Sequence, residues 1–477
     1  MLSFLDRDRS VAKPGFSRWL VPPAALAIHL SIGQIYAYSV FSKPMARLLG
    51  VAEPAAGDWS IATLGWIFTI ALAVLGASAA IFGKWLERVG PRKAMFFSAC
   101  CFAGGFLVSA LGVAMHNLWI VYLGNGVLGG IGLGLGYISP VSTLIKWFPD
   151  RPGLATGMAI MGFGGGAMVA SPLSVALMNV YGTPTSVGVA PTFVTMGILY
   201  FIFMMFGVFT VRVPPENWKP AGYVASASTK KLVTNANVDA DTAIRTPQFW
   251  LLFAVLCLNV TAGIGVLGQA SLMIQEMFSA ASVGEAAAVT AAAAAGFVGL
   301  LSLFNMAGRF FWSSVSDYIG RKNTYSIFFV LGAILYFLIP RFGASGNVVL
   351  FVISFCLILT MYGGGFATIP AYLRDLFGTL QVGAIHGRLL LAWSLAAVAG
   401  PVLINYIRQG QIDSGVPAAQ AYSVTMYIMA GLLVVGLICN LMVREVDSRF
   451  HVAEAKEPRM AATPKASKIA AAGDARN

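Results

Sequence analysis

Two short stretches of the chain decide its fold. The first reads Gly83-Lys-Trp-Leu-Glu87-Arg88-Val-Gly90-Pro-Arg92-Lys93, and the second reads Ser316-Asp317-Tyr-Ile-Gly320-Arg321-Lys322. Each places a carboxylate, a glycine and a basic pair directly after a long apolar run. Such a segment can form a charged clasp between helices, because the glycine allows a tight turn and the basic pair faces water. Glu87 and Asp317 lie 230 residues apart in a chain of 477, so we expect two related halves.

Apolar residues dominate the rest of the chain. Hydrophobic residues make up 58% of it and charged residues only 10%, with a mean hydropathy of +0.77. A soluble domain carries about 25% charged residues, so an ordinary water-soluble enzyme is excluded. The sequence instead predicts an all-α membrane protein, whose first span is too long for a cleaved signal peptide. We place twelve transmembrane helices near residues 20–42, 61–82, 94–115, 118–138, 153–176, 191–211, 248–273, 288–313, 324–340, 347–367, 386–406 and 423–443.

The basic residues fall unevenly on the two sides of these spans. On one side, the connecting segments and both tails hold 25 of the 31 Lys and Arg residues, and the opposite segments hold four. The remaining two, Arg309 and Arg388, fall inside predicted spans. Because basic loops stay in the cytoplasm, we expect both termini to be cytoplasmic and the protein to lie in the inner (plasma) membrane. This distribution explains the net charge of +12 without a nucleic-acid partner.

The spans divide the chain into five parts. Residues 1–18 are a cytoplasmic N-terminal tail, 19–211 a first six-helix bundle and 212–247 a cytoplasmic central loop. Residues 248–445 are the second six-helix bundle, and 446–477 a cytoplasmic tail that we expect to be disordered, because it has no apolar periodicity. The five cysteines lie inside apolar segments without metal-ligand spacing, and the four histidines are scattered. We therefore expect no metal, no cofactor and no enzymatic activity.

The two clasp segments resemble loop motifs of the major facilitator superfamily. The first is similar to the family's loop 2–3 motif, with Glu87 in place of the usual Asp, and the second is similar to its loop 8–9 counterpart. The family's arginine in span 4 is missing, because the stretch Gly126–Gly134 carries no charge. The resemblance covers residues 18–445. It implies two pseudo-symmetric six-helix bundles that transport a solute by alternating access.

Three further segments resemble a narrower branch of this family. Residues 146–164 are similar to the loop 4–5 and span 5 pattern that monocarboxylate transporters share with oxalate/formate antiporters. Residues 376–401 and the span-1 segment Tyr36-Ala-Tyr38-Ser-Val-Phe41 resemble the oxalate/formate antiporter branch. The resemblance implies transport of small carboxylates.

One basic residue lies deep inside a predicted span. Arg309 precedes Asp317, at the inner end of span 8, by eight residues, or roughly 12 Å along a helix. All nineteen Asp and Glu residues fall in loops, tails or span ends, so no carboxylate lies at this depth. We predict that Arg309 binds the carboxylate of the cargo through its planar donor fork. The alternative is an arginine that donates to carbonyls of a neighbouring helix. The resemblance favours the first interpretation, since transporters of both branches carry a substrate-binding arginine at this place.

Two positions depart from the resembled transporters. Proton-coupled monocarboxylate transporters carry an Asp four residues before this arginine, where Asn305 stands here, and an amide cannot exchange a proton. Some oxalate/formate antiporters carry a Lys in span 11 that holds a second carboxylate, where Trp393 stands here. A single cation suits a monoanion such as formate, acetate, lactate or glycolate. We therefore predict that Asn305 and Trp393 line a site that prefers monocarboxylates, although Trp393 could equally be a packing residue.

Span 1 supplies further polar candidates. Helical spacing puts Gln34 and Tyr38 on one face and His29 and Tyr36 on another, so at most one of the tyrosines should line a cavity. We take Gln34, Tyr36 and Tyr38 as candidates for substrate binding, with helix packing as an equally weighted alternative. His29 is a possible proton carrier because it lies at mid-membrane, although such a histidine more often binds a neighbouring helix.

Charged and aromatic residues are candidates for a cytoplasmic gate. Arg388, at the start of span 11, is expected to extend to the inner interface, with a gate role as the alternative. Two tyrosines fall at the predicted inner ends of spans 4 and 10 beside glycine runs. The gate candidates are Glu87, Arg88, Asp317, Arg321, Tyr137 and Tyr362.

These predictions combine into one function with alternatives. We expect a secondary active transporter of small carboxylate anions, working by oxalate/formate-type exchange with a preference for monocarboxylates. A proton-coupled monocarboxylate symporter is the alternative, and a carboxylate sensor is a third option that lacks a signalling domain. The expected partners are the small carboxylate and membrane lipid, and we expect a monomer.

Overall fold

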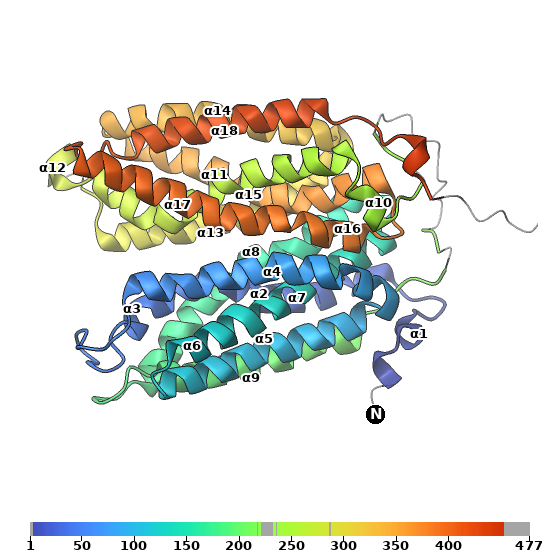
Figure 1. Ribbon diagram of the computed structural model, residues 1–477, viewed down its shortest axis with the longest axis horizontal. Coiled ribbons are helices and arrows are strands. Elements are labelled where there is room, and N and C mark those ends of the chain that lie inside the picture. The colour runs from blue at the N-terminus through green and yellow to red at the C-terminus, as the bar shows by residue number, and fades with distance from the viewer. Residues whose placement is uncertain (1–2, 217, 221–231, 235, 286–287, 453–477) are drawn as a thin grey trace, which may run out of the picture.

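The computed structural model describes residues 3–216, 218–220, 232–234, 236–285 and 288–452. Within these residues the chain is almost entirely helical (Figure 1). The helices form two groups, α2 to α9 and α11 to α18, which lie one above the other in Figure 1. The predicted disorder of residues 446–477 is wrong for the first part of the tail, because residues 448–450 form a 3-10 helix and the Val452 N–H donates to the Asn237 carbonyl (2.8 Å). Residues 453–477 lie outside the described residues.

The first group provides six spans, of which two are composite. Span 1 runs through α2 (Pro22–Ile32), the 3-10 helix η3 (Gly33–Phe41) and α3 (Ser42–Met45). Span 4 runs through α6 (Leu118–Val121), the π-helical η4 (Tyr122–Leu128) and α7 (Gly129–Trp147). The continuous spans are α4 (Ile61–Val89), α5 (Pro91–Ala114), α8 (Pro152–Tyr181) and α9 (Val189–Thr210). Ahead of them lie η1 (Ser3–Leu5), α1 (Arg7–Ser10) and η2 (Arg18–Leu20).

The second group has the same plan. Its long helices are α11 (Pro247–Met277), α13 (Ala291–Ile319), α14 (Arg321–Ala344), α15 (Val348–Phe377), α17 (Leu391–Asp413) and α18 (Ser423–Met442). The short helix α16 (Val382–Leu389) continues into α17. The remaining short elements are α10 (Ala240–Ala243), α12 (Ala280–Val283) and η6 (Ser448–Phe450).

Length and composition qualify most of these segments as membrane spans. Within the described chain, 11 helical segments are long and apolar enough to cross a membrane. The remaining long helix is α13, whose 29 residues extend about 44 Å at 1.5 Å per residue. The predicted all-α architecture of two six-helix halves is thereby confirmed.

The repeat in the sequence corresponds to a repeat of helix lengths in the structure. The helices α4 and α13 both have 29 residues, and α5 and α14, which follow them, both have 24. Gly90 and Gly320 join these pairs with φ angles of 85° and 86°, which glycine adopts without steric cost. Glu87 and Asp317 therefore occupy corresponding places, each third from the end of its helix.

The basic residues of the two motifs bind the last helix of each half. Arg92 donates from Nη2 to the Val211 carbonyl (3.0 Å), just after α9. Lys322 donates from Nζ to the Leu441 carbonyl (2.7 Å) and the Val443 carbonyl (2.8 Å), at the end of α18. A helix C-terminus leaves carbonyls unsatisfied and favours a cation. Each motif therefore ties the third helix of its half to the sixth.

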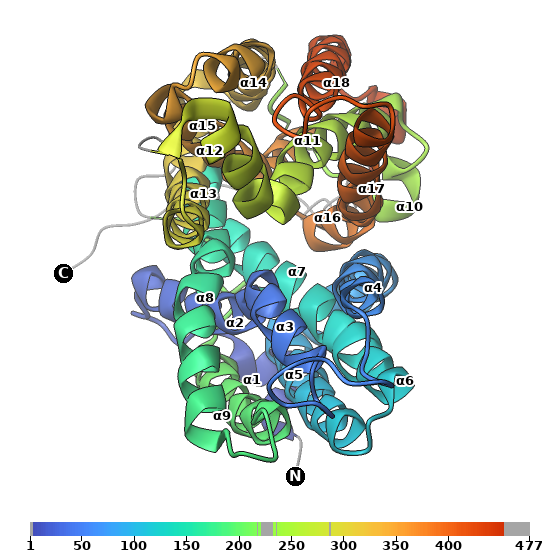
Figure 2. The same ribbon diagram turned by 90° about the vertical axis from the view of Figure 1, so that its left-hand side faces the viewer.

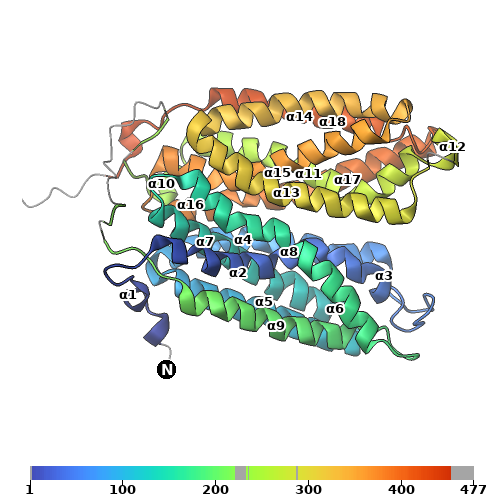
Figure 3. The ribbon, with the colours of Figure 1, turned by 180° about the vertical axis from the view of Figure 1, so that it is seen from behind.

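The two halves meet along two sets of helices. The helix α4 packs on α16 and α17, and α8 packs on α13 and α15, as Figures 2 and 3 show from the end and from behind. We call the face that carries residues 3–20 and 236–246 the linker face. Among the described residues, the hydrogen bonds between the halves lie from mid-membrane toward this face. The halves are therefore closed toward the linker face.

Candidate functional site

Arg309 lies on α13 where the two halves meet, and its side chain is fully buried. Its Nε donates to the side-chain oxygen of Asn305, one turn earlier on the same helix (3.2 Å). Nη1 and Nη2 have no hydrogen-bond partner among the described residues. The Tyr36 and Tyr137 hydroxyls interact with the guanidinium, and both are neutral groups. Since a buried charge without a counter-charge is costly, an anion that binds Nη1 and Nη2 would stabilise this side chain.

Two phenylalanines from different halves flank the guanidinium. The Arg309 Cζ lies 5.5 Å from the ring centre of Phe163 on α8 and 5.2 Å from that of Phe366 on α15. A cation over an aromatic face is attracted by the ring quadrupole, more strongly where water is excluded. The rings hold the charge in the membrane interior without neutralising it, so the guanidinium keeps its attraction for an anion.

Glycines allow the helices to close around Arg309. A Cβ atom at Gly164 of α8 would lie 3.1 Å from the Arg309 Nε, and one at Gly363 of α15 would lie 2.6 Å from the Asn305 side-chain oxygen. Neither glycine has a positive φ, so the requirement is space and not backbone conformation. The glycine runs in these spans therefore let both halves approach the arginine.

Further aromatic side chains complete the surroundings of the arginine. The hydroxyls of Tyr36 on η3 and Tyr362 on α15 lie 3.3 Å apart and join the halves. Trp393 is fully buried and packs on Phe366 (4.5 Å), Tyr137 (5.4 Å) and Phe163 (5.5 Å between ring centres). Among the described residues, the Trp393 Nε1 and the Tyr137 hydroxyl make no hydrogen bond. Arg309 and several hydrogen-bond donors thus lie among one group of packed aromatic rings.

The structure separates the span-1 candidates. Tyr36 points to the other half, whereas the Tyr38 hydroxyl accepts a hydrogen bond from the Asn125 amide (3.2 Å) inside the first half. Gln34 is buried, and no hydrogen bond joins it to Arg309 within the described residues. Only Tyr36 of these three is therefore brought to the arginine. Asn305 is adjacent to Arg309, and its side-chain oxygen accepts the hydrogen bond from the Arg309 Nε, which orients the guanidinium.

His29 is held between two helices of the first half. Its Nδ1 lies at the Ala159 carbonyl of α8, and its Nε2 lies 3.2 Å from the Tyr137 carbonyl of α7. The side chain is fully buried. Both neighbours are acceptors, and a neutral imidazole can donate to only one of them.

The expected position of two gate tyrosines was wrong. Tyr137 and Tyr362 lie beside Trp393 and Tyr36 and not at inner helix ends, because α7 continues to Trp147 and α15 to Phe377. The backbone hydrogen bonds of these helices continue beyond the apolar run, so the end of the apolar run does not mark the end of the helix. Both tyrosines belong to the surroundings of Arg309.

The two motif carboxylates form equivalent contacts across the halves. Asp317 accepts hydrogen bonds from the backbone N–H groups of Gly153 (2.8 Å) and Leu154 (2.9 Å) at the start of α8. Glu87 accepts one from the N–H of Gly383 (3.1 Å) at the start of α16. A carboxylate at a helix N-terminus satisfies free donors and meets the positive end of the helix dipole. Gly153 and Gly383 are themselves 230 residues apart, so the repeat builds two matching contacts that close the linker face.

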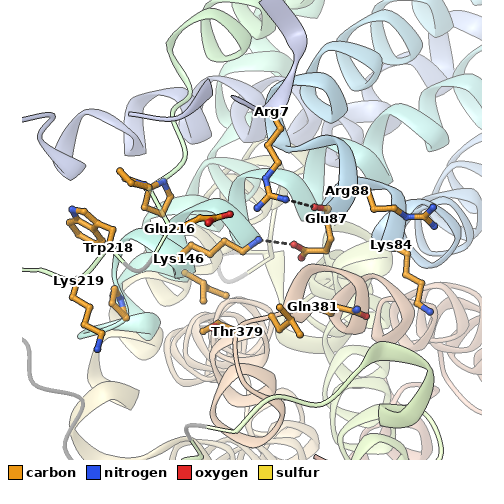
Figure 4. Close-up of a pocket in the computed structure, with 15 residues that line it drawn as sticks. Arg7, Lys84, Glu87, Arg88, Lys146, Glu216, Trp218, Lys219, Thr379 and Gln381 are labelled. Atoms are coloured by element: carbon orange, nitrogen blue, oxygen red, sulfur yellow. Dashed lines mark hydrogen bonds and ion pairs between the residues drawn. The ribbon is translucent and has the colours of Figure 1, made fainter. Parts of the chain in front are cut away.

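Basic residues hold these carboxylates in place. Arg321 binds Asp317 through Nη2 (2.5 Å) and Asp375 of α15 through Nε (3.1 Å). Lys146 binds Glu87 (2.6 Å), and Figure 4 shows this pair beside the bond from Arg7 to the Glu87 carbonyl. The predicted clasp residue Arg88 is exposed and forms no hydrogen bond or ion pair among the described residues, so Lys146 supplies the cation instead.

A cavity of about 880 Å³ opens at the linker face beside Glu87. Its walls come from both halves, since Lys84, Glu87 and Lys146 belong to the first and Thr379 and Gln381 to the second. The cavity therefore changes shape whenever the halves separate on this side.

The central connection adds a third link between the halves. Asp241 of α10 binds Lys84 of α4 and Arg388 of α16 (2.5 Å to Nη2), and Arg388 also donates to the Ala240 carbonyl. Arg388 thus pairs with the connection and does not extend freely to lipid. The hydrogen bond from Lys84, followed by that from Arg388, lowers the pKa of the Asp241 carboxyl to about 2.

We expect Asp241→Asn to increase exposure of the linker face by about two- to fivefold. The effect is small because exposed ion pairs contribute only about 0–1 kcal/mol. Because the pKa of Asp241 is lowered, its ionised carboxylate stabilises the contact above the ordinary pKa of 3.8, and this stabilisation is lost as the pH falls toward 2. The contact should therefore not vary between pH 5 and 8. Thiol labelling of Ser142→Cys, at the contact of α7 and α16, measures this exposure at each pH. Labelling of Ser142→Cys with Asp241 unchanged that rises between pH 8 and 5 would contradict the assignment.

Several residues of the site were missing from the sequence predictions. Phe163 and Phe366 contact Arg309, and Gly383 and Asp241 contact the gate charges. The signal for Phe163 and Phe366 was present, because each is a large ring next to a glycine run in a span. Among the described residues, no three His, Cys, Asp or Glu side chains lie close enough to bind a metal ion.

Two six-helix halves that meet around a buried cation are the architecture of a multi-pass membrane transporter. The chain belongs to the Major Facilitator Superfamily, whose sequence profile matches residues 16–304 and 277–473.

Several known proteins that are similar to the chain are transporters. It is 28% identical over 385 residues to the oxalate:formate antiporter of Oxalobacter formigenes, covering 80% of this chain and 83% of that protein. It is 31% identical over 168 residues to human monocarboxylate transporter 11, covering 34% of this chain and 33% of that protein. The solved structure of the proton:xylose symporter XylE superposes with a TM-score of 0.66 at 14% identity, covering 88% of this chain and 94% of that one, which supports the fold alone.

Proposed function

We propose that the protein is a secondary transporter that exchanges small carboxylate anions, with a preference for monocarboxylates. The observation that carries this proposal is the buried guanidinium of Arg309, whose Nη1 and Nη2 have no hydrogen-bond partner among the described residues. A carboxylate matches these two donors in charge and in geometry. The oxalate:formate antiporter and the monocarboxylate transporter among the similar proteins support the same class of cargo.

The gate contacts support an alternating-access cycle. Arg309, Trp393 and Tyr137 are fully buried, so the cargo site is covered in this conformation. Opening toward the linker face requires Asp317 to release Gly153 and Leu154, and Glu87 to release Gly383. We assign the linker face to the cytoplasm, because the basic segments lie there, and we place the protein in the inner membrane.

Exchange predicts that uptake depends on an internal anion. Proteoliposomes loaded with formate should accumulate labelled acetate at least about tenfold faster than empty ones, because the empty carrier leaves the Arg309 charge unpaired in the membrane during its return. The measurement is counterflow at constant pH. Full uptake into vesicles without an internal anion would contradict exchange.

Proton-coupled symport is the second candidate, with His29 as the proton carrier. Its two ring nitrogens face two carbonyl oxygens, an arrangement that only the protonated imidazolium satisfies fully. Symport through His29 requires that uptake acidify the lumen, and that His29→Gln remove this acidification. A luminal pH dye distinguishes the mechanisms, since exchange of two monoanions leaves the pH unchanged.

A further inference from the structure

The cavity at the linker face carries more positive than negative charge on its walls. Five basic and two acidic side chains line it, which leaves an excess of three positive charges. These side chains are Arg7, Lys84, Arg88, Lys146 and Lys219, with Glu87 and Glu216 (Figure 4). A cleft that is lined by one sign of charge concentrates ions of the opposite sign. The lining therefore favours an anion that carries more than one charge.

Three of the five cations have no carboxylate partner among the described residues. Lys84 and Lys146 are bound to carboxylates. Arg7 donates to a backbone carbonyl (3.5 Å), whereas Arg88 and Lys219 make no hydrogen bond or ion pair within the described chain. All three side chains are exposed, so a ligand from the water can reach them.

The internal repeat shows that this excess of charge is not required for the contact between the halves. The residues that stand 230 positions after three of the cations are uncharged. These pairs are Lys84 and Ser314, Arg88 and Tyr318, and Lys146 and Leu376. At the second contact, two arginines are balanced by the carboxylates of Asp317 and Asp375. The excess of positive charge therefore belongs to the first contact alone.

The wall from the second half supplies neutral donors. The Thr379 hydroxyl and the Gln381 amide N–H groups donate no hydrogen bond among the described residues. Figure 4 shows both side chains across the cavity from Arg7, with Glu87 and Lys146 between them. An anion that the cations of the first half bind can accept hydrogen bonds from these donors. Such an anion joins the halves beside the weaker of the two carboxylate contacts, since Glu87 accepts one backbone hydrogen bond across the halves.

We propose that this cavity binds a phosphate-bearing anion with at least two charges, and that the bound anion holds the linker face closed. A phosphate group carries about two negative charges and several strong acceptor oxygens, whereas a monocarboxylate carries one charge. A water-soluble phosphate and the headgroup of an anionic lipid present this same chemistry. A ligand that binds one conformation shifts the population toward it, so transport slows when the anion is bound. The inference goes beyond the proposed function and does not depend on the identity of the cargo.

The test measures how pyrophosphate changes thiol labelling of Ser142→Cys in nanodiscs of phosphatidylcholine. At ten times its Kd, pyrophosphate should lower the labelling rate about tenfold relative to sodium chloride of equal ionic strength, because it binds only the closed form. Arg88→Gln combined with Lys219→Gln should abolish this protection. Lys13→Gln combined with Arg245→Gln is the matched control, because it removes an exposed arginine and an exposed lysine from the linker face outside the cavity.

Nanodiscs that contain phosphatidylglycerol identify the source of the phosphate. If a lipid headgroup fills the cavity, labelling is already slow without pyrophosphate and becomes fast in the combined variant of Arg88 and Lys219. Protection by pyrophosphate in phosphatidylcholine assigns the cavity to a soluble phosphate. Either result supports the proposal, because both depend on the same cations.

Four results would overturn the role of the cavity. These are no protection by pyrophosphate or by anionic lipid, equal protection by sodium chloride, equal protection in the combined variant of Arg88 and Lys219, and loss of protection in Arg309→Met. The last result would place pyrophosphate at the cargo site and not in the cavity. All of these measurements are made without a transported carboxylate, so their failure leaves the proposed function untouched, and failure of counterflow leaves the cavity untouched.

Discussion

Replacing Arg309 with Gln should lower carboxylate exchange by at least about 30-fold. Loss of one partner of a buried charge pair costs about 2–5 kcal/mol, and each 1.4 kcal/mol is a factor of ten. Arg309→Lys should also be strongly impaired, because an ammonium group cannot offer two parallel donors to a carboxylate. Initial rates of labelled formate or acetate counterflow at equal protein density measure the effect. Arg341→Gln, which removes an arginine stacked on Phe337 far from the site, is the matched control and should stay within about twofold.

Thermal stability separates a cargo-binding arginine from a structural one. Removal of an arginine that held helices together would lower the Tm. Arg309 lacks hydrogen-bond partners for Nη1 and Nη2 among the described residues, so its charge should destabilise the empty protein. We therefore expect Arg309→Met to raise the Tm of the empty protein and to abolish the Tm increase that formate gives the wild type. A lower Tm together with undiminished exchange would contradict the proposed site.

Replacing Asp317 with Asn should shift the protein toward conformations open at the linker face by about ten- to a hundredfold. The carboxylate accepts two backbone hydrogen bonds from the other half and binds Arg321. Its side chain is only 10% exposed, so solvent screens these contacts weakly. A hydrogen bond to a charged group contributes about 1.5–3 kcal/mol, and the amide has neither the charge nor the second acceptor oxygen.

Labelling of Ser142→Cys with a membrane-impermeant thiol reagent reports this shift, because Ser142 is buried against Gly383 at the contact of the halves. Glu87→Gln should act in the same direction but less strongly, since Glu87 accepts one backbone hydrogen bond across the halves where Asp317 accepts two. Asp413→Asn is the control, because this exposed carboxylate binds only Gln409 of its own helix within the described residues. Equal labelling of Ser142→Cys with and without Asp317→Asn would show that the contact does not keep the linker face closed.

The membrane architecture and one site residue could be predicted from the chain alone. Hydropathy is a local property, so apolar runs locate the spans without knowledge of their neighbours. The repeat around Glu87 and Asp317 corresponds in the structure to two helices of equal length and to two equivalent contacts across the halves. Arg309 could be singled out because a charge inside an apolar run is visible in one dimension.

Other site residues could not be predicted because their positions depend on helices distant in sequence. Phe163, Phe366 and His386 come from three spans and approach Arg309 or its neighbours only after the halves have packed. Tyr36 and Tyr38 were correctly expected to point apart, but only folding decides that Tyr36 meets Tyr362 and Tyr38 meets Asn125.

The amino-acid order by itself determined how many times the chain crosses the membrane, that its halves repeat, and that one guanidinium lies without a carboxylate at its depth. Each of these follows from residues close together in the chain and from the cost of placing charge in hydrocarbon. Only the tertiary structure decided what surrounds that guanidinium and which backbone N–H groups the gate carboxylates bind. These contacts join residues more than a hundred positions apart, and the close approach of whole helices, which glycine makes possible, brings them together.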